Sequence, residues 1–406
     1  MRKLKTALVC ASFLLLACGD DSSGTNDAAS SGGDGGPGVD AAVGSDAATG
    51  QDAAVEPDAG CSDTLADAVR LTDVSISNTL GSQAITAEVG AGSVVAWAAT
   101  DGIHVTPLDG DDQRAGVDLV VEGSRVFGVE ATAADIALLV SRPPDYMTFT
   151  RVDHQGAVLA SADLVGGGDH GVEGVEWFGE FATTGRLVAR DDGTYAAYHA
   201  LHRHWPDGVG HQGDTLRLLD AAAQPLGGGW GWGCSHSMDQ RIAFGSTGLV
   251  PICIADCYPG KGIYYNHNQA LITEDPAANC AGGYTTALGG LVAVADGFWL
   301  VFQDDDGGAH LGHYDAGGQL LNERLLSVEG SSRLAAYGNV FLLGSAGGGG
   351  CSLQELDATG ADIGVSFNAA VSLPAQDFES RSNGEVAWAV ASGTTLTVVR
   401  VQRLCQ

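Results

Sequence analysis

The sequence predicts an all-β fold assembled from similar four-stranded sheets. Sixty glycines and a charged fraction of only 17 % indicate many tight turns and strands, because long surface helices are normally rich in Lys and Glu. An internal repeat of about 44 residues, with alternating apolar segments and a glycine turn in each copy, indicates one small sheet per copy. The 406 residues, 45 % of them hydrophobic, are sufficient for a large buried core.

Residues 1–17 have the features of an export signal. Three cations near the start precede the apolar run from Ala7 to Ala17, which is too short to span a bilayer. The run ends in Leu15-Leu16-Ala17-Cys18-Gly19, which resembles the lipobox of bacterial lipoproteins. The resemblance implies that Cys18 becomes the acylated first residue of the mature chain and ties it to a membrane. Gly19 after the cysteine favours the outer membrane of the bacterial cell envelope.

Residues 18–60 are predicted to be a disordered acidic tether. Their composition is dominated by Gly, Ala, Ser and Asp, with nine acids and no base, so they bury too little apolar surface to offset the entropy lost on ordering. Removing these nine acids and the three cations of the signal leaves 16 bases and 41 acids in residues 61–406, a net charge of −25. Nucleic acid is therefore not an expected partner, because phosphate binding needs a positive surface.

Residues 61–406 are predicted to form one β-propeller. Three segments share one order of four strands, with an Asp-x-x-Gly turn before the fourth: Ser124–Val165, Gly290–Leu326 and Ser332–Val371. Their turns are Asp153–Gly156, Asp315–Gly318 and Asp357–Gly360, and Asp109-Gly110 and Asp220 occupy the same place in less regular copies. The spacing predicts repeats that end near residues 120, 166, 229, 275, 328 and 373 and at the C-terminus. Seven such repeats resemble a seven-bladed propeller, with six or eight blades as alternatives.

The last repeat is one strand short. It contains apolar strands around Val386–Val390 and Leu396–Val401, but no fourth strand follows them. Residues 66–77, at the start of the folded region, are predicted to supply the missing strand and so to close the ring. Because one architecture of this kind serves many activities, the fold alone predicts no function.

Export permits disulfides, and seven cysteines follow Cys18. The predicted pairs are Cys61–Cys405 across the ends of the folded region, Cys253–Cys257 within a local loop, and Cys234–Cys280. Cys351 is left unpaired. A structural zinc site is disfavoured, because one CxxxC motif lacks the second pair of ligands.

Polar and aromatic residues concentrate in the third and fourth repeats. In a four-stranded blade, the loop between the second and third strands emerges on the same face as the connection to the next blade. Three segments are therefore predicted to lie side by side: the loop 201–214 of the third repeat, the connection 227–241, and the loop 256–261 of the fourth repeat.

One hypothesis for this face is a divalent transition-metal site holding zinc, copper or manganese. Its ligands would be His199, His202, His204, His211, Asp214 and His236. His202 and His204 would point to one side of an extended segment, as chelation requires. The metal would serve a lyase or hydrolase acting on a polymer. A serine nucleophile is poorly supported, because no Gly-x-Ser-x-Gly turn is present.

The preferred hypothesis is a ligand-binding face. Aromatic rings would stack on a sugar or peptide and a cation would meet a carboxylate; the residues are Trp205, Trp230, Trp232, Arg241, Tyr258 and Lys261. A structural alternative is that the Gly-Trp-Gly-Trp-Gly segment packs between blades and the imidazoles bond to backbone groups. We therefore predict a lipid-anchored, monomeric envelope protein that binds a small molecule, a glycan, a peptide or another envelope protein.

Overall fold

The computed structural model describes residues 62–167, 172–179, 183–236, 239–267, 269–281 and 283–404. The predicted signal and tether, with Cys18, lie outside these residues, as do Cys61 and Cys405. In the described part of the chain the structure is β throughout, apart from the one-turn helix α1 (Leu65–Ala68). No helix there is long and apolar enough to cross a membrane.

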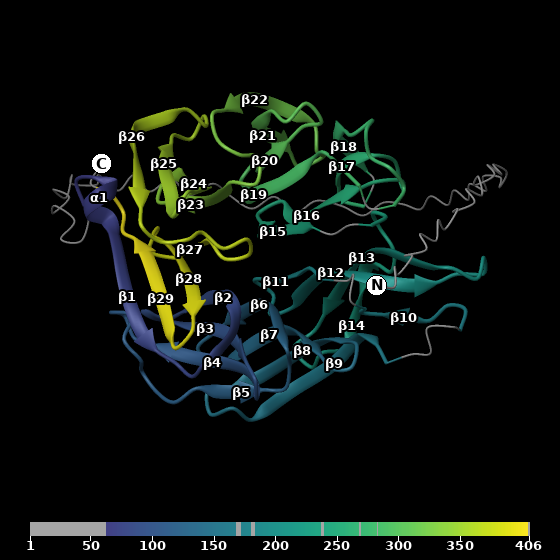
Figure 1. Ribbon diagram of the computed structural model, residues 1–406, viewed down its shortest axis with the longest axis horizontal. Coiled ribbons are helices and arrows are strands. Elements are labelled where there is room, and N and C mark those ends of the chain that lie inside the picture. Colours follow the sequence, from purple (N-terminus) through teal and green to yellow (C-terminus); the bar gives the residue numbers. More distant parts are fainter. Residues whose placement is uncertain are drawn as a thin grey trace, which may run out of the picture. The chain divides into compact units, whose positions relative to one another are not determined.

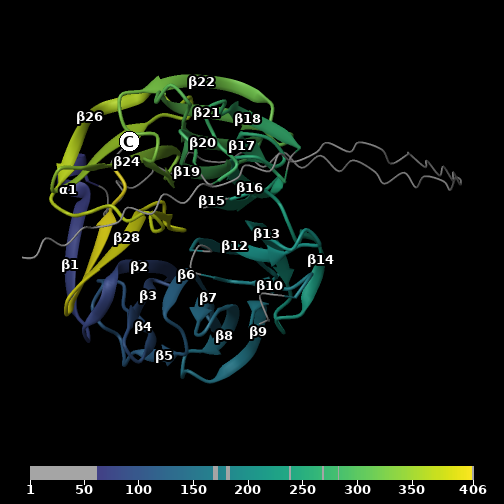
Figure 2. The ribbon, with the colours of Figure 1, turned by 45° about the vertical axis from the view of Figure 1, so that its right-hand side comes forward.

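The strands group into antiparallel sets of four that follow one another around a ring (Figures 1 and 2). Four sets are separate four-stranded sheets, and a further sheet has an additional two-residue strand at its inner edge. The largest sheet, of eight strands, consists of two sets joined by the single pair Gln83 and Val390. The described residues therefore contain seven sets, which we number in chain order.

Within each set the strands follow one another from the centre of the ring outward. The first set is β2 (Thr79–Val89), β3 (Gly92–Ala99), β4 (Gly102–Leu108) and β5 (Leu119–Val121), and the second is β6 (Arg125–Ala131), β7 (Asp135–Arg142), β8 (Tyr146–Asp153) and β9 (Val158–Gly166). In the third set, β10 (Glu176–Trp177) and β11 (Gly185–Ala189) share one edge of β12 (Tyr195–His204), followed by β13 (Gly210–Leu219) and β14 (Pro225–Trp230). The fourth set is β15 (Gln240–Gly245), β16 (Gly248–Ala255), β17 (Gly262–Tyr265) and β18 (Ala270–Glu274).

The remaining three sets continue the ring. The fifth is β19 (Ala287–Val294), β20 (Gly297–Gln303), β21 (Ala309–Asp315) and β22 (Leu320–Leu326), and the sixth is β23 (Arg333–Tyr337), β24 (Val340–Gly347), β25 (Gly350–Leu356) and β26 (Asp362–Ala369). The seventh is β27 (Glu379–Ser380), β28 (Val386–Ser392), β29 (Thr395–Val401) and, from the other end of the chain, β1 (Val69–Ser75). The predicted all-β propeller is confirmed, and the strand predicted within residues 66–77 pairs along β29 from end to end.

The aspartate turns join the third strand of a set to the fourth, as predicted. The carboxylate of Asp153 accepts two backbone N–H groups of its own turn, and Gly156 has a φ of +87°. The turn after Asp220 has no glycine, and Ala223 takes the left-handed conformation instead, with a φ of +61°. In the first set the left-handed residue is Asp112, at +60°, so this turn extends further than the predicted Asp109-Gly110 pair.

The hydrophobic core lies between the faces of neighbouring sets. The second strand of a set is covered on both faces, so β7 and β20 are buried along nearly their whole length. The outermost strands, such as β22, are largely exposed. Each hydrophobic cluster joins two neighbours; one combines Phe127 and Leu139 of the second set with Leu201 of the third. Side-by-side packing of sheets therefore decides which loops can meet at the ends of the ring.

Candidate functional site

The three segments predicted to lie side by side at the third and fourth sets are neighbours in the structure. Residues 233–236 of the connection between them run between β13 and the loop that follows β16. On one side Ser235 pairs with Gly213 in an antiparallel bridge. On the other side its N–H donates to the carbonyl oxygen of Tyr258 at 2.7 Å. The structure thus brings the histidine-rich and tryptophan-rich segments side by side.

An aromatic pair lies where these segments meet. Trp205, at the tip of the β12–β13 hairpin, packs edge-to-face against Trp232 of the connection, with ring centroids 5.3 Å apart. The guanidinium of Arg203 lies 4.5 Å from the centroid of Trp205. Both indoles remain partly exposed, and the neighbouring loop carries the exposed side chains of Tyr258 and Lys261. Four of the predicted ligand residues therefore keep surface that a ligand can contact.

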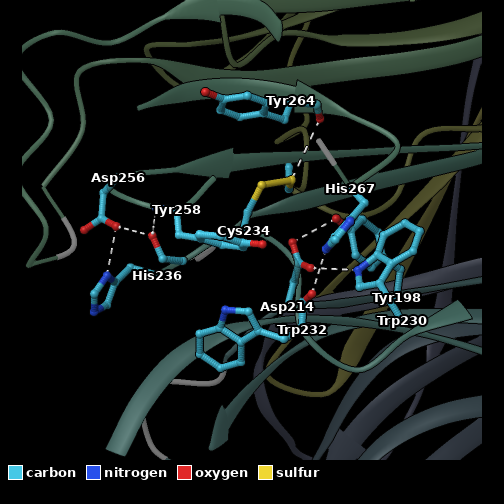
Figure 3. Close-up of a disulfide and its surroundings, with 12 residues drawn as sticks. Tyr198, Asp214, Trp230, Trp232, Cys234, His236, Asp256, Tyr258, Tyr264 and His267 are labelled. Atoms are coloured by element: carbon cyan, nitrogen blue, oxygen red, sulfur yellow. Dashed lines mark hydrogen bonds and ion pairs between the residues drawn. A yellow bond between two sulfur atoms is a disulfide. The ribbon is translucent and has the colours of Figure 1, made fainter. Parts of the chain in front are cut away.

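Trp230, unlike Trp205 and Trp232, contacts a buried carboxyl group. Its Nε1–H donates to Oδ1 of Asp214 at 3.1 Å, and the hydroxyl of Tyr198 donates to Oδ2 at 2.9 Å (Figure 3). Its ring also packs against His267, with centroids 5.3 Å apart. Asp214 is completely buried, and desolvation raises its pKa to about 6 despite these two donors. Trp230 therefore contacts a buried carboxyl group, and it packs between the third and fourth sets, as the structural alternative predicted for this segment.

Arg241 does not join the aromatic residues. It lies on the innermost strand β15 and lines the central channel of the ring. Its guanidinium donates to the carbonyl oxygens of Leu288 and Gly289 and pairs with Asp239. Arg241 was predicted to lie on the same ligand face as Tyr258. The structure places it in the central channel instead.

The six predicted metal ligands are not brought together. The register of β12 with β13 places His199 and His211 on one face of the hairpin and His202, His204 and Asp214 on the other. His199 is completely buried, its Nδ1 lies 2.9 Å from the carbonyl oxygen of Ala200, and desolvation lowers its pKa to about 4.

One outer member of this set, His211, has a carboxylate partner of its own. His211 lies 2.8 Å from Asp207, within the hairpin tip. Among the described residues, the one close group of three metal-type ligand atoms is Asp214 with Cys234 and Cys253, whose sulfurs are bonded to each other. A disulfide offers no thiolate to a metal ion, so this group does not provide the predicted site.

Asp256 holds the connection in place through hydrogen bonds. It is completely buried, and its Oδ1 accepts the hydroxyl of Ser235 at 2.8 Å and lies 2.9 Å from Nδ1 of His236 (Figure 3). The Ser235 oxygen also accepts the N–H of Tyr258 at 2.8 Å. Because serine and histidine contact the same carboxylate oxygen, the imidazole does not stand between the other two groups, as a catalytic triad requires.

The disulfide pairing differs from the prediction. The bonds are Cys234–Cys253 and Cys257–Cys280, in place of Cys253–Cys257 and Cys234–Cys280. Cys253 belongs to β16, which stays extended to Ala255 and so carries the chain away from Cys253 before Cys257 is reached. Cys351 is buried and unpaired, as predicted.

The predicted pair Cys61–Cys405 lies outside the described residues. The neighbours of these cysteines in the sequence, Ser62 and Leu404, form a parallel bridge, and the N–H of Ser62 donates to Arg403 at 2.9 Å. The two ends of the described chain therefore lie side by side, which the predicted bond would require.

The sequence reasoning named Arg241 but missed the two arginines that line the central channel with it. Arg186, Arg241 and Arg333 occupy the first or second position of three innermost strands, β11, β15 and β23. The signal that could have found them is positional: in four repeats, Arg125 included, an arginine stands directly before the apolar residues of the first strand.

Comparison with known proteins identifies the architecture. No protein-family model and no curated protein matches the chain. The WD40 domain of Toxoplasma gondii coronin has a TM-score of 0.51 at 10 % identity, with 86 % of this chain and 89 % of that chain covered. The WD40 domain of Neurospora crassa Pan2 gives 0.47 at 9 % identity over 80 % and 89 %, and the PQQ-bound aldose sugar dehydrogenase of Streptomyces coelicolor gives 0.40 at 14 % over 70 % and 96 %. The similarity to the coronin domain shows the β-propeller fold alone.

Proposed function

We propose that this chain is a lipid-anchored, extracytoplasmic β-propeller that binds a glycan at the junction of its third and fourth sets. The observation that carries the proposal is the edge-to-face pair of Trp205 and Trp232, which stays partly exposed where two loops and a connection meet. Indole rings stack on the apolar faces of sugar rings, and the nearby Tyr258 and Lys261 can bond to hydroxyl groups. A peptide or another envelope protein would use the same surface.

The membrane anchor in this proposal rests on the lipobox resemblance at Cys18. The acidic tether of residues 18–60 would then give the propeller reach from the outer membrane, and the monomer would present the aromatic pair to ligands outside the cytoplasm.

Fluorescence titration tests the binding site. Oligomers of N-acetylglucosamine added to the purified protein are expected to change tryptophan emission, and Trp205→Ala or Trp232→Ala should weaken binding about tenfold or more. Tyr146→Ala is the matched control, because Tyr146 also lies beneath an arginine, Arg142 at 5.0 Å, but on the second set. If oligoalanine binds and the sugars leave the tryptophan emission unchanged, the ligand is a peptide and not a glycan. Unchanged affinity in both tryptophan variants would reject this site.

A labelled form of the same sugar, applied to intact cells, tests the anchor. Cys18→Ser should abolish cell-associated binding while leaving the affinity of the purified protein unchanged. Retention of the variant at the cell surface would contradict lipidation at Cys18.

A further inference from the structure

The centre of the ring contains a cavity of about 540 Å³. Its lining includes residues of β2, β6, β11, β15, β19 and β23 and of the segment 375–380, so all seven sets contribute to it. Pockets of this size hold small ligands in other proteins. The cavity is separate from the aromatic pair of the proposed glycan site, because neither Trp205 nor Trp232 lines it.

Three guanidinium groups lie together at one level of this cavity. Arg186, Arg241 and Arg333 each stand at the start of an innermost strand, and these strands run in the same direction around the ring. Desolvation, together with the positive charge of Arg241, lowers the pKa of Arg186 to about 9 and that of Arg333 to about 10. Both groups remain charged at neutral pH, in a protein whose folded region is otherwise strongly acidic.

The positive charge of this cluster is incompletely balanced. Asp239 is the carboxylate shared by the group: it pairs with Arg241 and lies 3.4 Å from Arg186. In the described part of the chain Arg333 forms no ion pair, and donates to the carbonyl oxygens of Ser331 at 2.6 Å and Pro374 at 3.2 Å. Two carboxylates, Asp239 and Glu379, therefore act on three guanidiniums, and Arg333 lines the cavity with an Nη2 group that makes no hydrogen bond within the described residues.

Acidic groups also line the cavity, Glu130, Asp377 and Glu379 among them. Burial, together with the negative charge of Glu379, raises the pKa of Glu130 to about 8. Burial also raises the pKa of Glu379, against the opposing effect of the positive charge of Arg186. Asp377 already accepts the N–H groups of Thr86 at 3.0 Å and Ala389 at 2.6 Å, which join the first and seventh sets. Glu130 is thus mostly protonated at neutral pH, Asp377 holds the ring together, and Glu379 acts on Arg186.

We propose that the central channel binds a small organic carboxylate through the guanidinium groups of Arg186 and Arg333, with Arg241 fixed behind them. The planar fork of arginine matches the two oxygens of a carboxylate, and the buried position strengthens the attraction. The fit is to a small acid rather than to a polymer, because the site is enclosed within the ring. This site is additional to the proposed glycan surface.

Calorimetric titration of the purified protein with succinate and citrate tests the proposal, with glucose as the uncharged probe and inorganic phosphate as a second anion. The wild type should bind a carboxylate and not glucose. Arg333→Gln and Arg186→Gln should each weaken carboxylate binding about 10- to 100-fold, the range expected for losing a charged hydrogen bond, and Arg333→Lys should restore part of it. Arg324→Gln, which removes an exposed arginine of β22 paired with Asp362, is the control and should bind as the wild type.

Several results would overturn the inference. These are absence of binding heat with both carboxylates, binding of phosphate alone, or wild-type affinity in both glutamine variants. Circular dichroism of each variant shows whether it is folded, and either glutamine variant that folds suffices for the test. The alanine variants of Trp205 and Trp232 should retain carboxylate binding, so failure of the glycan proposal and failure of this one are distinguishable.

Discussion

Asp214 is a carboxyl group placed where water does not solvate it. Two donors, Trp230 and Tyr198, contact its oxygens, yet the cost of burial exceeds their effect and its pKa rises to about 6 from 3.8. His199, on the neighbouring strand and the opposite face of the same hairpin, is buried neutral with its pKa lowered to about 4 from 6.5. The hairpin therefore contains an acid and a base whose effects on stability have opposite pH dependence.

For Asp214, the folded chain binds more protons than the unfolded chain between pH 4 and 6, so its contribution to stability falls as pH rises through this window. The free energy of unfolding of the wild type, relative to Asp214→Asn, should drop by about 2 kcal/mol from pH 4 to 7. Urea denaturation across this range measures it. Relative to His199→Gln, the wild type should instead gain stability as pH rises from 4 to 6.5. A difference between wild type and Asp214→Asn that does not vary with pH would contradict the assigned burial.

At the scale of elements, two disulfides fix the loops around the fourth set. Cys234–Cys253 ties the connection between the third and fourth sets to β16, and Cys257–Cys280 ties the following loop to the segment that leads to the fifth set. The sequence predicted which four cysteines are bonded but paired them wrongly, because sequence proximity does not show where an extended strand ends. The partners were decided by packing between sets, which single-sequence spacing does not contain.

Cleavage before aspartate distinguishes the two pairings. Such cleavage at Asp220, Asp239, Asp256 and Asp275 separates all four cysteines into different peptides. Under non-reducing conditions, mass spectrometry should find peptide 220–238 joined to 239–255, and 256–274 joined to 275–295. A species joining 239–255 to 256–274 would restore the local pair. Reduction should release all four peptides in either case.

At the scale of the whole molecule, a buried ion cluster supports ring closure. Asp112, in a turn of the first set, is 1 % exposed and contacts two strands of the seventh. Its Oδ1 accepts Nε–H of Arg400 at 2.7 Å, and its Oδ2 accepts Nη2–H of Arg70 at 2.9 Å. The first and last parts of the folded chain are thus joined by charge as well as by the pairing of β1 with β29.

Asp112→Ala leaves the buried Arg400 with Glu385, 3.5 Å away, as its remaining carboxylate partner and should lower the free energy of unfolding by about 3 kcal/mol. The control is Asp362→Ala, which removes the partner of Arg324 at a more exposed pair and should cost no more than about 1 kcal/mol. Equilibrium urea unfolding of both variants provides the comparison. Equal and small losses in the two variants would show that the buried cluster contributes little to closure.

The architecture was predictable because it is repeated. The spacing of the aspartate turns predicted the bounds of the three regular sets to within a few residues. The missing strand of the last repeat indicated that residues 66–77 close the ring. The meeting of Trp205 with Trp232 also followed, because loop position in a blade depends only on strand order. The metal site could not be tested from the sequence, because it requires the histidines to point to one side. The pairing of β12 with β13 and the burial of each side chain decide this, and they separate the histidines. Of the three channel arginines only Arg241 was named from the sequence, and it was assigned to the aromatic face, because the distance between these residues in the sequence hides their common place in the ring.

The pairing of β1 with β29 also has a consequence for how the chain is made. A polypeptide synthesised from its N-terminus holds β1 without its partner until residues 395–401 have been added. A chain that stops before them keeps two unpaired sheet edges, which are free to join other chains. The final strand thus separates a closed ring from a product prone to self-association.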